Sequence, residues 1–138
     1  MWKLLIVFSI LFTASQLSFG QSKSSDLKQG LVSPYDVLKL EDEIGLSKSQ
    51  RDSLRSSIRA SESKFNSWNK QLEVAMKKMV ELLSNETVSE KAVMRQMDEI
   101  LDIEKKIKKE QLRLLVKTKN TLRITQIEKI KVEIKVKN

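Results

Sequence analysis

A heptad repeat of apolar residues over 54–82 constrains the fold of this chain more than any other feature of its sequence. Its members recur at alternating steps of four and three positions, which is the spacing of helices that pack along a shared seam. They are Leu54, Ile58, Ser61, Phe65, Trp68, Leu72, Ala75, Met79 and Leu82, with Ser61 the one polar member. The pattern predicts one long helix that needs a partner helix.

A second apolar stripe at helical spacing follows a short polar break over 84–87. Glu104 and Gln111 interrupt this stripe. Its apolar members are Val93, Met97, Ile100, Ile107, Leu114 or Leu115, and Leu122. Two stripes joined by so short a break predict an all-α fold, built on a long antiparallel helical hairpin over 46–122.

Capping residues predict where these two helices begin. Residues 47–50, Ser-Lys-Ser-Gln, have the spacing of a capping box, in which a hydroxyl and a Gln or Glu three positions later satisfy the first backbone N–H groups. Residues 87–90, Thr-Val-Ser-Glu, repeat that spacing. We therefore expect helices over about 48–83 and from 88 to about 119.

Two short helices are expected to flank the hairpin. Ser33 and Pro34 favour a helix start, and Gly45 favours its end after about three turns. Beyond a break at 120–121, the tail over 127–136 fits either a last helix or an edge strand, because its final residues alternate in polarity. We favour the helix because the surroundings are helical. The predicted helical domain spans 33–136.

The first twenty residues have the composition of a secretory signal peptide: Lys3, an apolar run over 4–12, and small residues Ser18 and Gly20 before the expected cleavage point. An uncleaved membrane anchor is the alternative. Residues 21–32 are expected to form a flexible tether. The working domain is therefore predicted to be exported and soluble.

The charge and the missing residue types limit the function. The chain has 26 Lys and Arg against 18 Asp and Glu, which favours anionic lipid or acidic protein as a partner; an exported chain rarely meets nucleic acid. It contains no His and no Cys, no Gly-rich phosphate loop and no recognisable nucleophile. We expect a binding protein, with neither enzymatic activity nor a cofactor.

Two copies of a Leu-Thr-x-x-Gln-like motif bracket the hairpin, and behind a signal peptide this arrangement resembles the CpxP/Spy family of bacterial periplasmic proteins. The first copy carries Ser in place of Thr, and the second carries Arg123 there, so its capping hydroxyl is lost or displaced to Thr125. The matching residues are Leu46, Ser47, Gln50, Leu122 and Gln126.

The resemblance implies a four-helix protomer that forms an antiparallel, cradle-shaped dimer with a basic concave face in the periplasm. It further implies an ATP-independent chaperone for unfolded envelope proteins, or an accessory of a membrane sensor or anti-sigma partner in the envelope stress response. A structural or interaction protein without chaperone activity is the alternative within the binding class.

A neighbouring branch, similar to the CnrX and ZraP proteins, senses or binds heavy metals. The missing His and Cys remove the usual ligands for zinc, nickel or cobalt, and carboxylates alone would bind weakly. Soft thioether ligands are the remaining metal hypothesis, directed at Cu(I) or Ag(I), with packing of the hairpin as the alternative role. The four methionines that face each other across the break are Met76, Met79, Met94 and Met97.

Client binding is assigned to basic residues that attract acidic unfolded chains and to aromatic residues that grip them. A surface tuned only for solubility is the alternative for the basic set, and a seam position is the alternative for Trp68. The set is Arg51, Arg55, Arg59, Phe65, Trp68, Lys105, Lys109 and Arg113. The apolar segment over 112–116 is wider than one seam requires, which favours burial against a partner subunit.

Overall fold

The computed structural model describes residues 30–136, and within that range every regular element is a helix. The helices are α3 (Pro34–Lys39), α4 (Lys48–Leu83), α5 (Glu90–Thr121) and α6 (Ile124–Val136). The tail is therefore helical, and the edge-strand alternative is wrong. The predicted signal peptide over 1–20 and most of the predicted tether lie outside the described residues.

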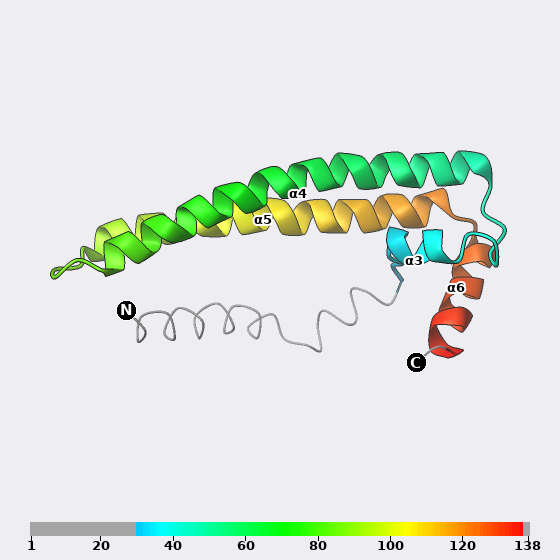
Figure 1. The fold of residues 1–138 in the computed structure, drawn as a ribbon. Helices are drawn as coiled ribbons and strands as arrows, with labels where there is room; N and C mark the ends of the chain where they lie inside the picture. The colour runs from blue at the N-terminus through cyan, green and yellow to red at the C-terminus, as the bar shows by residue number, and fades with distance from the viewer. Residues whose placement is uncertain (1–29, 137–138) are drawn as a thin grey trace. The chain divides into compact units, whose positions relative to one another are not determined.

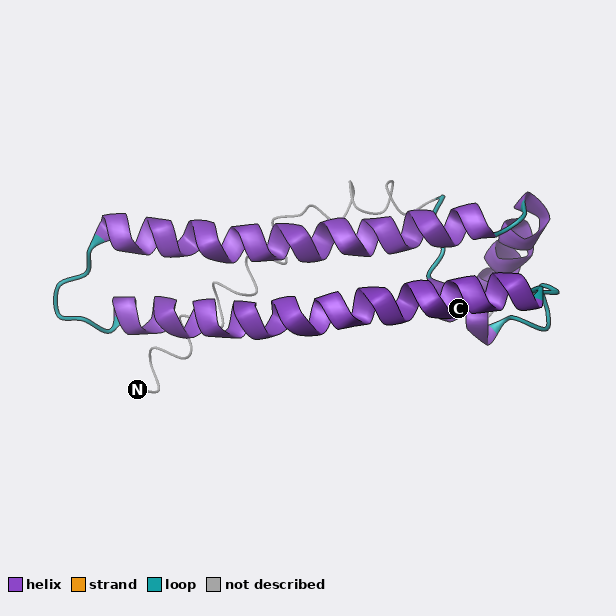
Figure 2. Cartoon of the chain, turned by 90° about the horizontal axis from the view of Figure 1, so that it is seen from above, coloured by secondary structure: helices purple, strands orange, loops and turns teal. Residues whose placement is uncertain are grey.

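Helices α4 and α5 lie side by side and run in opposite directions, which confirms the predicted helical hairpin (Figures 1 and 2). The capping box that begins α4 is present: the Gln50 backbone N–H donates to Ser47 Oγ at 3.2 Å, and the Ser47 N–H donates to Gln50 Oε1 at 3.0 Å. Helix α4 ends at Leu83, as expected.

The predicted start of the second long helix is wrong by two residues. Ser89 is the N-cap of α5, and its Oγ accepts the Ala92 backbone N–H at 3.4 Å. Glu90 consequently lies in the first turn, where its charge interacts favourably with the helix dipole, and it does not serve Thr87 as a capping partner. Within 30–136, none of the helices is long and apolar enough to cross a membrane.

The seam of α4 is formed by the predicted heptad residues. Leu54, Ile58, Ser61, Ala75 and Met79 are buried, and the other members are half-buried. The buried stripe of α5 is rotated about the helix axis relative to the predicted apolar stripe. Its buried residues are Gln96, Ile100, Ile103, Glu110, Leu114 and Thr118.

The polar residues in the α5 seam are therefore not the predicted Glu104 and Gln111, and the predicted seam residue Met97 is 37% exposed. The buried polar groups are tolerated because each has a hydrogen-bond partner. Gln96 Nε2 donates to the Ala75 carbonyl of α4 at 2.9 Å, and Thr118 Oγ1 donates to the Leu114 carbonyl at 2.8 Å.

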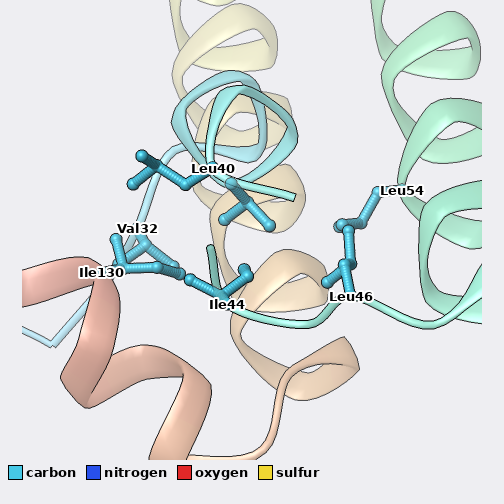
Figure 3. Close-up of a cluster of buried hydrophobic side chains, with 7 residues drawn as sticks. Val32, Leu40, Ile44, Leu46, Leu54 and Ile130 are labelled. Carbon is cyan, nitrogen blue, oxygen red and sulfur yellow. The ribbon is translucent and has the colours of Figure 1, made fainter. Parts of the chain in front are cut away.

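The main apolar core lies at the base of the hairpin, where α3, the start of α4 and α6 converge (Figure 3). Its members are Val32, Val37, Leu40, Ile44, Leu46, Leu54 and Ile130. Val32, the last residue of the predicted tether, is buried in this core.

Helix α3 is shorter than predicted because it ends at Lys39. The chain then turns: the Ile44 N–H donates to the Leu40 carbonyl at 3.0 Å, and the Leu46 N–H donates to the Glu41 carbonyl at 2.8 Å. Gly45 completes the turn with a φ of 63°, a conformation that is costly for other residues. These turns direct Ile44 and Leu46 into the core, which a continued helix would not.

Candidate functional site

The two motif copies meet at the base of the hairpin through Gln50 and Gln126. Each side-chain amide donates to the other's oxygen, at 2.9 and 3.2 Å. Gln50 Nε2 also donates to the Thr121 carbonyl at 2.8 Å, and Gln126 Nε2 donates to the Gly45 carbonyl at 3.2 Å. The pair therefore links the start of α4, the end of α5 and the start of α6.

Each glutamine also caps the helix that contains it. Gln126 Oε1 accepts the Arg123 backbone N–H at 2.9 Å, so the second copy retains the glutamine half of a capping box without a hydroxyl at position 123. The motif leucines pack nearby: Leu46 belongs to the core, and Leu122 lies against it. The motif residues thus have a structural role, which is to hold α6 and the α3 segment on the hairpin.

A buried carboxylate lies between α4 and α5 at mid-length. Glu110 is 3% exposed, and its Oε1 accepts hydrogen bonds from Ser61 Oγ and Lys64 Nζ, each at 3.0 Å. Arg113 binds the second carboxylate oxygen. Burial by itself would raise the pKa of Glu110, but the hydrogen bonds from Lys64, Ser61 and Arg113 outweigh it and lower the pKa. The charged form is thereby held in the seam.

The predicted basic set is distributed over separate places. Arg51 and Arg55 form ion pairs with Glu41, at 4.0 and 3.5 Å, so Glu41 neutralises part of their positive charge. Arg59 is exposed. These three arginines share a ridge of α4, as their spacing predicts.

The α5 members of the basic set are separated in the same way. Arg113 is held by Glu110, whereas Lys105 and Lys109 are exposed beside a shallow hollow of about 300 Å³ that residues of α5 alone surround. The predicted aromatic residues Phe65 and Trp68 are half-buried on α4 in an edge-to-face contact, with ring centroids 6.5 Å apart. No single surface gathers the predicted client-binding set.

A groove between α4 and α5, toward the connecting turn, was not foreseen from the sequence. It consists of two adjoining hollows of about 540 and 490 Å³ that share Glu99. Apolar residues from both helices contribute to it, and charges of both signs line it. Its residues include Val74, Leu82, Ile103, Lys70, Lys78, Arg95, Lys106, Glu81, Glu99 and Asp102.

Small and polar residues lie at this groove and in the seam beside it. Ala75 and Gln96 occupy seam positions here, and their contact is a side-chain to backbone hydrogen bond instead of interlocking apolar side chains. Ala92 lines the hollow beside them. Short side chains leave space between two helices that larger residues would fill. Ala92 of α5, a small residue that lines this groove, is not a member of the predicted apolar stripe.

The four methionines of the metal hypothesis lie in different environments. Met79 is buried in the seam and Met76 is half-buried, whereas Met94 is 54% exposed and Met97 is 37% exposed. Met79 lies in the seam, whereas Met94 and Met97 lie on the exposed side of α5, so the four thioethers do not share one surface. Within 30–136, no cluster of three His, Cys, Asp or Glu side chains is arranged to hold a metal ion either.

The chain matches no protein-family model, no curated protein and no solved structure. Three features of its own residues define the site: a motif pair that organises the base, a carboxylate paired with two cations at mid-length, and an open groove toward the turn.

Proposed function

We propose that this protein is a periplasmic, ATP-independent binding protein that holds unfolded or partner polypeptides in the groove between α4 and α5. It acts as a chaperone for envelope proteins or as an accessory of a membrane stress sensor. The observation that carries this proposal is the groove itself, in which exposed Val74 and half-buried Leu82 of α4 and half-buried Ala92 of α5 lie among charged residues.

The groove suits variable polypeptide segments better than a small ligand. It is shallow and long, so an extended or helical segment can lie along it, and its apolar contacts do not require one side-chain shape. Val74 is 61% exposed at this groove, and an apolar segment that covers it removes that surface from water.

Net positive charge supports the capture step. An excess of Lys and Arg over Asp and Glu attracts acidic chains over a distance and raises their association rate, an effect that salt screens. The resemblance of the two motifs to the CpxP/Spy family supports the same class of function and the periplasmic location. It also supports a dimer, which we include in the proposal.

The test is suppression of aggregation of a reduced, unfolding model protein by the full chain, without ATP, at low and high salt. We expect suppression that weakens with salt. Val74→Glu, in the groove, is expected to reduce the suppression several-fold. Val132→Glu on α6 is the matched control, because Val132 is 60% exposed and contributes to neither hollow of the groove.

If both variants suppress aggregation as well as the unaltered chain does, clients do not bind in the groove. If the unaltered chain suppresses no aggregation at either salt concentration, the chaperone role is overturned. The role as an accessory of a membrane stress sensor then remains.

A further inference from the structure

Helix α6 has an apolar face on the side that points away from the core. Ile124 and Val136, at 76% and 77%, are the most exposed of the large apolar side chains that the structure describes, and Val132 between them is 60% exposed. At about 100° per residue, the mean direction of these three is about 150° from that of Gln126 and Ile130, which are buried. One face of α6 is therefore in the core and the other is in water.

The inner face of α6 is fixed to the rest of the helical domain. Ile130 lies in the core with Val32 and Ile44 (Figure 3), and Gln126 exchanges hydrogen bonds with Gln50. Figure 1 shows α6 turning away from the axis of the hairpin after the end of α5. The outer face of α6 is thus presented to solvent without any opening of the fold.

Basic residues surround this outer apolar face. The exposed charged side chains over 123–136 are four basic and one acidic, and the remaining acid, Glu133, is half-buried. The exposed ones are Arg123, Lys129, Lys131, Lys135 and Glu128. By direction around the helix, Lys129 and Lys131 lie at the two edges of the apolar face, whereas Glu128 lies within it. The face consequently favours a partner with negative charge.

An anionic lipid surface fits this face better than an acidic protein. The three apolar residues are spread over the whole length of α6, which is 13 residues or about 20 Å, on a convex surface. A bilayer surface accepts such a face in any register, whereas a protein would need a groove of matching length. Lysine stems also allow the ammonium groups at the edges to reach lipid phosphates while the apolar residues enter below them. A helix of this length lies on a bilayer without crossing it.

We propose that the outer face of α6 docks on an anionic lipid surface. Ile124, Val132 and Val136 enter the boundary between the headgroups and the acyl chains, and Lys129 and Lys131 bind lipid phosphates on either side. Neither hollow of the client groove is lined by a residue of α6, so docking uses no part of that groove. Docking on lipid is therefore independent of client binding and separable from it by mutation.

A local fluorescent label tests this contact, because the chain has no Cys of its own. Thr125→Cys in the full chain places one labelling site on the outer face of α6, and Asn69→Cys at an exposed site of α4 is the matched control. Each is labelled with a dye whose emission shifts to the blue in an apolar environment. The vesicles contain phosphatidylglycerol and phosphatidylcholine, or phosphatidylcholine alone. The label at 125 distinguishes docking by α6 from attachment through the predicted signal peptide, which would leave that label in water.

Two substitutions in the labelled Thr125→Cys chain change the affinity for lipid in opposite directions. Val132→Glu is expected to weaken vesicle binding about tenfold, because it removes an apolar contact and adds a negative charge. Glu128→Lys is expected to strengthen vesicle binding about tenfold, since it replaces the one exposed acid of the face with a base. The matched controls are Val74→Glu and Glu73→Lys at exposed sites of α4, which should change the binding by less than about twofold. Circular dichroism checks that each variant remains helical.

We expect the label at 125 to shift on vesicles that contain phosphatidylglycerol, with a smaller shift at high salt, and the label at 69 to stay unchanged. No shift at 125, or an equal shift on phosphatidylcholine alone, would overturn the proposal. A shift produced by polyglutamate and not by the vesicles would assign the face to an acidic protein and overturn it too. Unchanged vesicle binding in both Val132→Glu and Glu128→Lys would have the same consequence.

Discussion

Gln50 and Gln126 hydrogen-bond to each other through both amides, at 2.9 and 3.2 Å, although 76 residues separate them in the chain. Each also binds a backbone carbonyl on a neighbouring segment. The two motif copies therefore form one structural unit, and the glutamine at the end of each copy makes the hydrogen bonds that hold the unit together.

Replacing Gln126 with Leu is expected to destabilise the fold by about 2 to 4 kcal/mol, because Gln50 and the Gly45 carbonyl lose their partner while part-buried. Urea unfolding followed by circular dichroism measures the loss. Gln71→Leu is the matched control, since Gln71 makes only an exposed bond to Ser67 and should change stability by less than about 0.5 kcal/mol. Equal losses in both variants would contradict a special role for the pair.

Acid is expected to weaken the mid-length contact at Glu110. Hydrogen bonds from Lys64, Ser61 and Arg113 hold the pKa of Glu110 below its usual 4.5, so its stabilising effect is present above pH 4.5. The effect is lost as the pH falls through the lower pKa of the folded state. Stability should therefore decline in acid more steeply in the unaltered chain than in Glu110→Gln.

Glu110→Gln should also cost about 1 to 3 kcal/mol at pH 7, because a neutral amide accepts weaker hydrogen bonds from the two cations. The cost is limited because Lys64 and Arg113 are themselves partly exposed to water. The control is Glu73→Gln at an exposed site of α4. Parallel pH profiles for Glu110→Gln and the unaltered chain would show that Glu110 is not the responsible group.

Two hydroxyl side chains, those of Thr87 and Ser89, precede α5, and the Ser89 side chain caps the helix. Ser89→Ala should destabilise the protein by about 1 kcal/mol, because its Oγ accepts the Ala92 N–H. Thr87→Ala should have little effect, because Thr87 is exposed and lies outside the helix. Thermal unfolding of both variants decides the matter. A larger loss of stability in Thr87→Ala than in Ser89→Ala would show that Thr87 is the cap, as the capping-box spacing predicts.

Local signals were sufficient to predict the helices. The bounds of α4 followed from the capping box at Ser47 and from the polar break after Leu83, and both depend on residues within one turn of the helix end. At the start of α5 two capping signals competed, Thr87 and Ser89, and the capping-box spacing predicted the wrong N-cap. The site was harder to predict, because the groove is lined by residues of both helices, Val74 of α4 and Ile103 of α5 among them, and a pattern of apolar positions in one helix does not show which face of the other helix adjoins it.

The amino-acid sequence by itself determined that this chain forms a long helical hairpin, because heptad spacing and capping are properties of neighbouring residues. It did not determine which face of α5 turns inward, since apolar residues occupy two faces of that helix. The tertiary structure decided this by pairing buried polar groups across the seam, Glu110 with Ser61 and Gln96 with Ala75. Such pairs form in one rotation and register only, because a buried polar group without a partner is too costly.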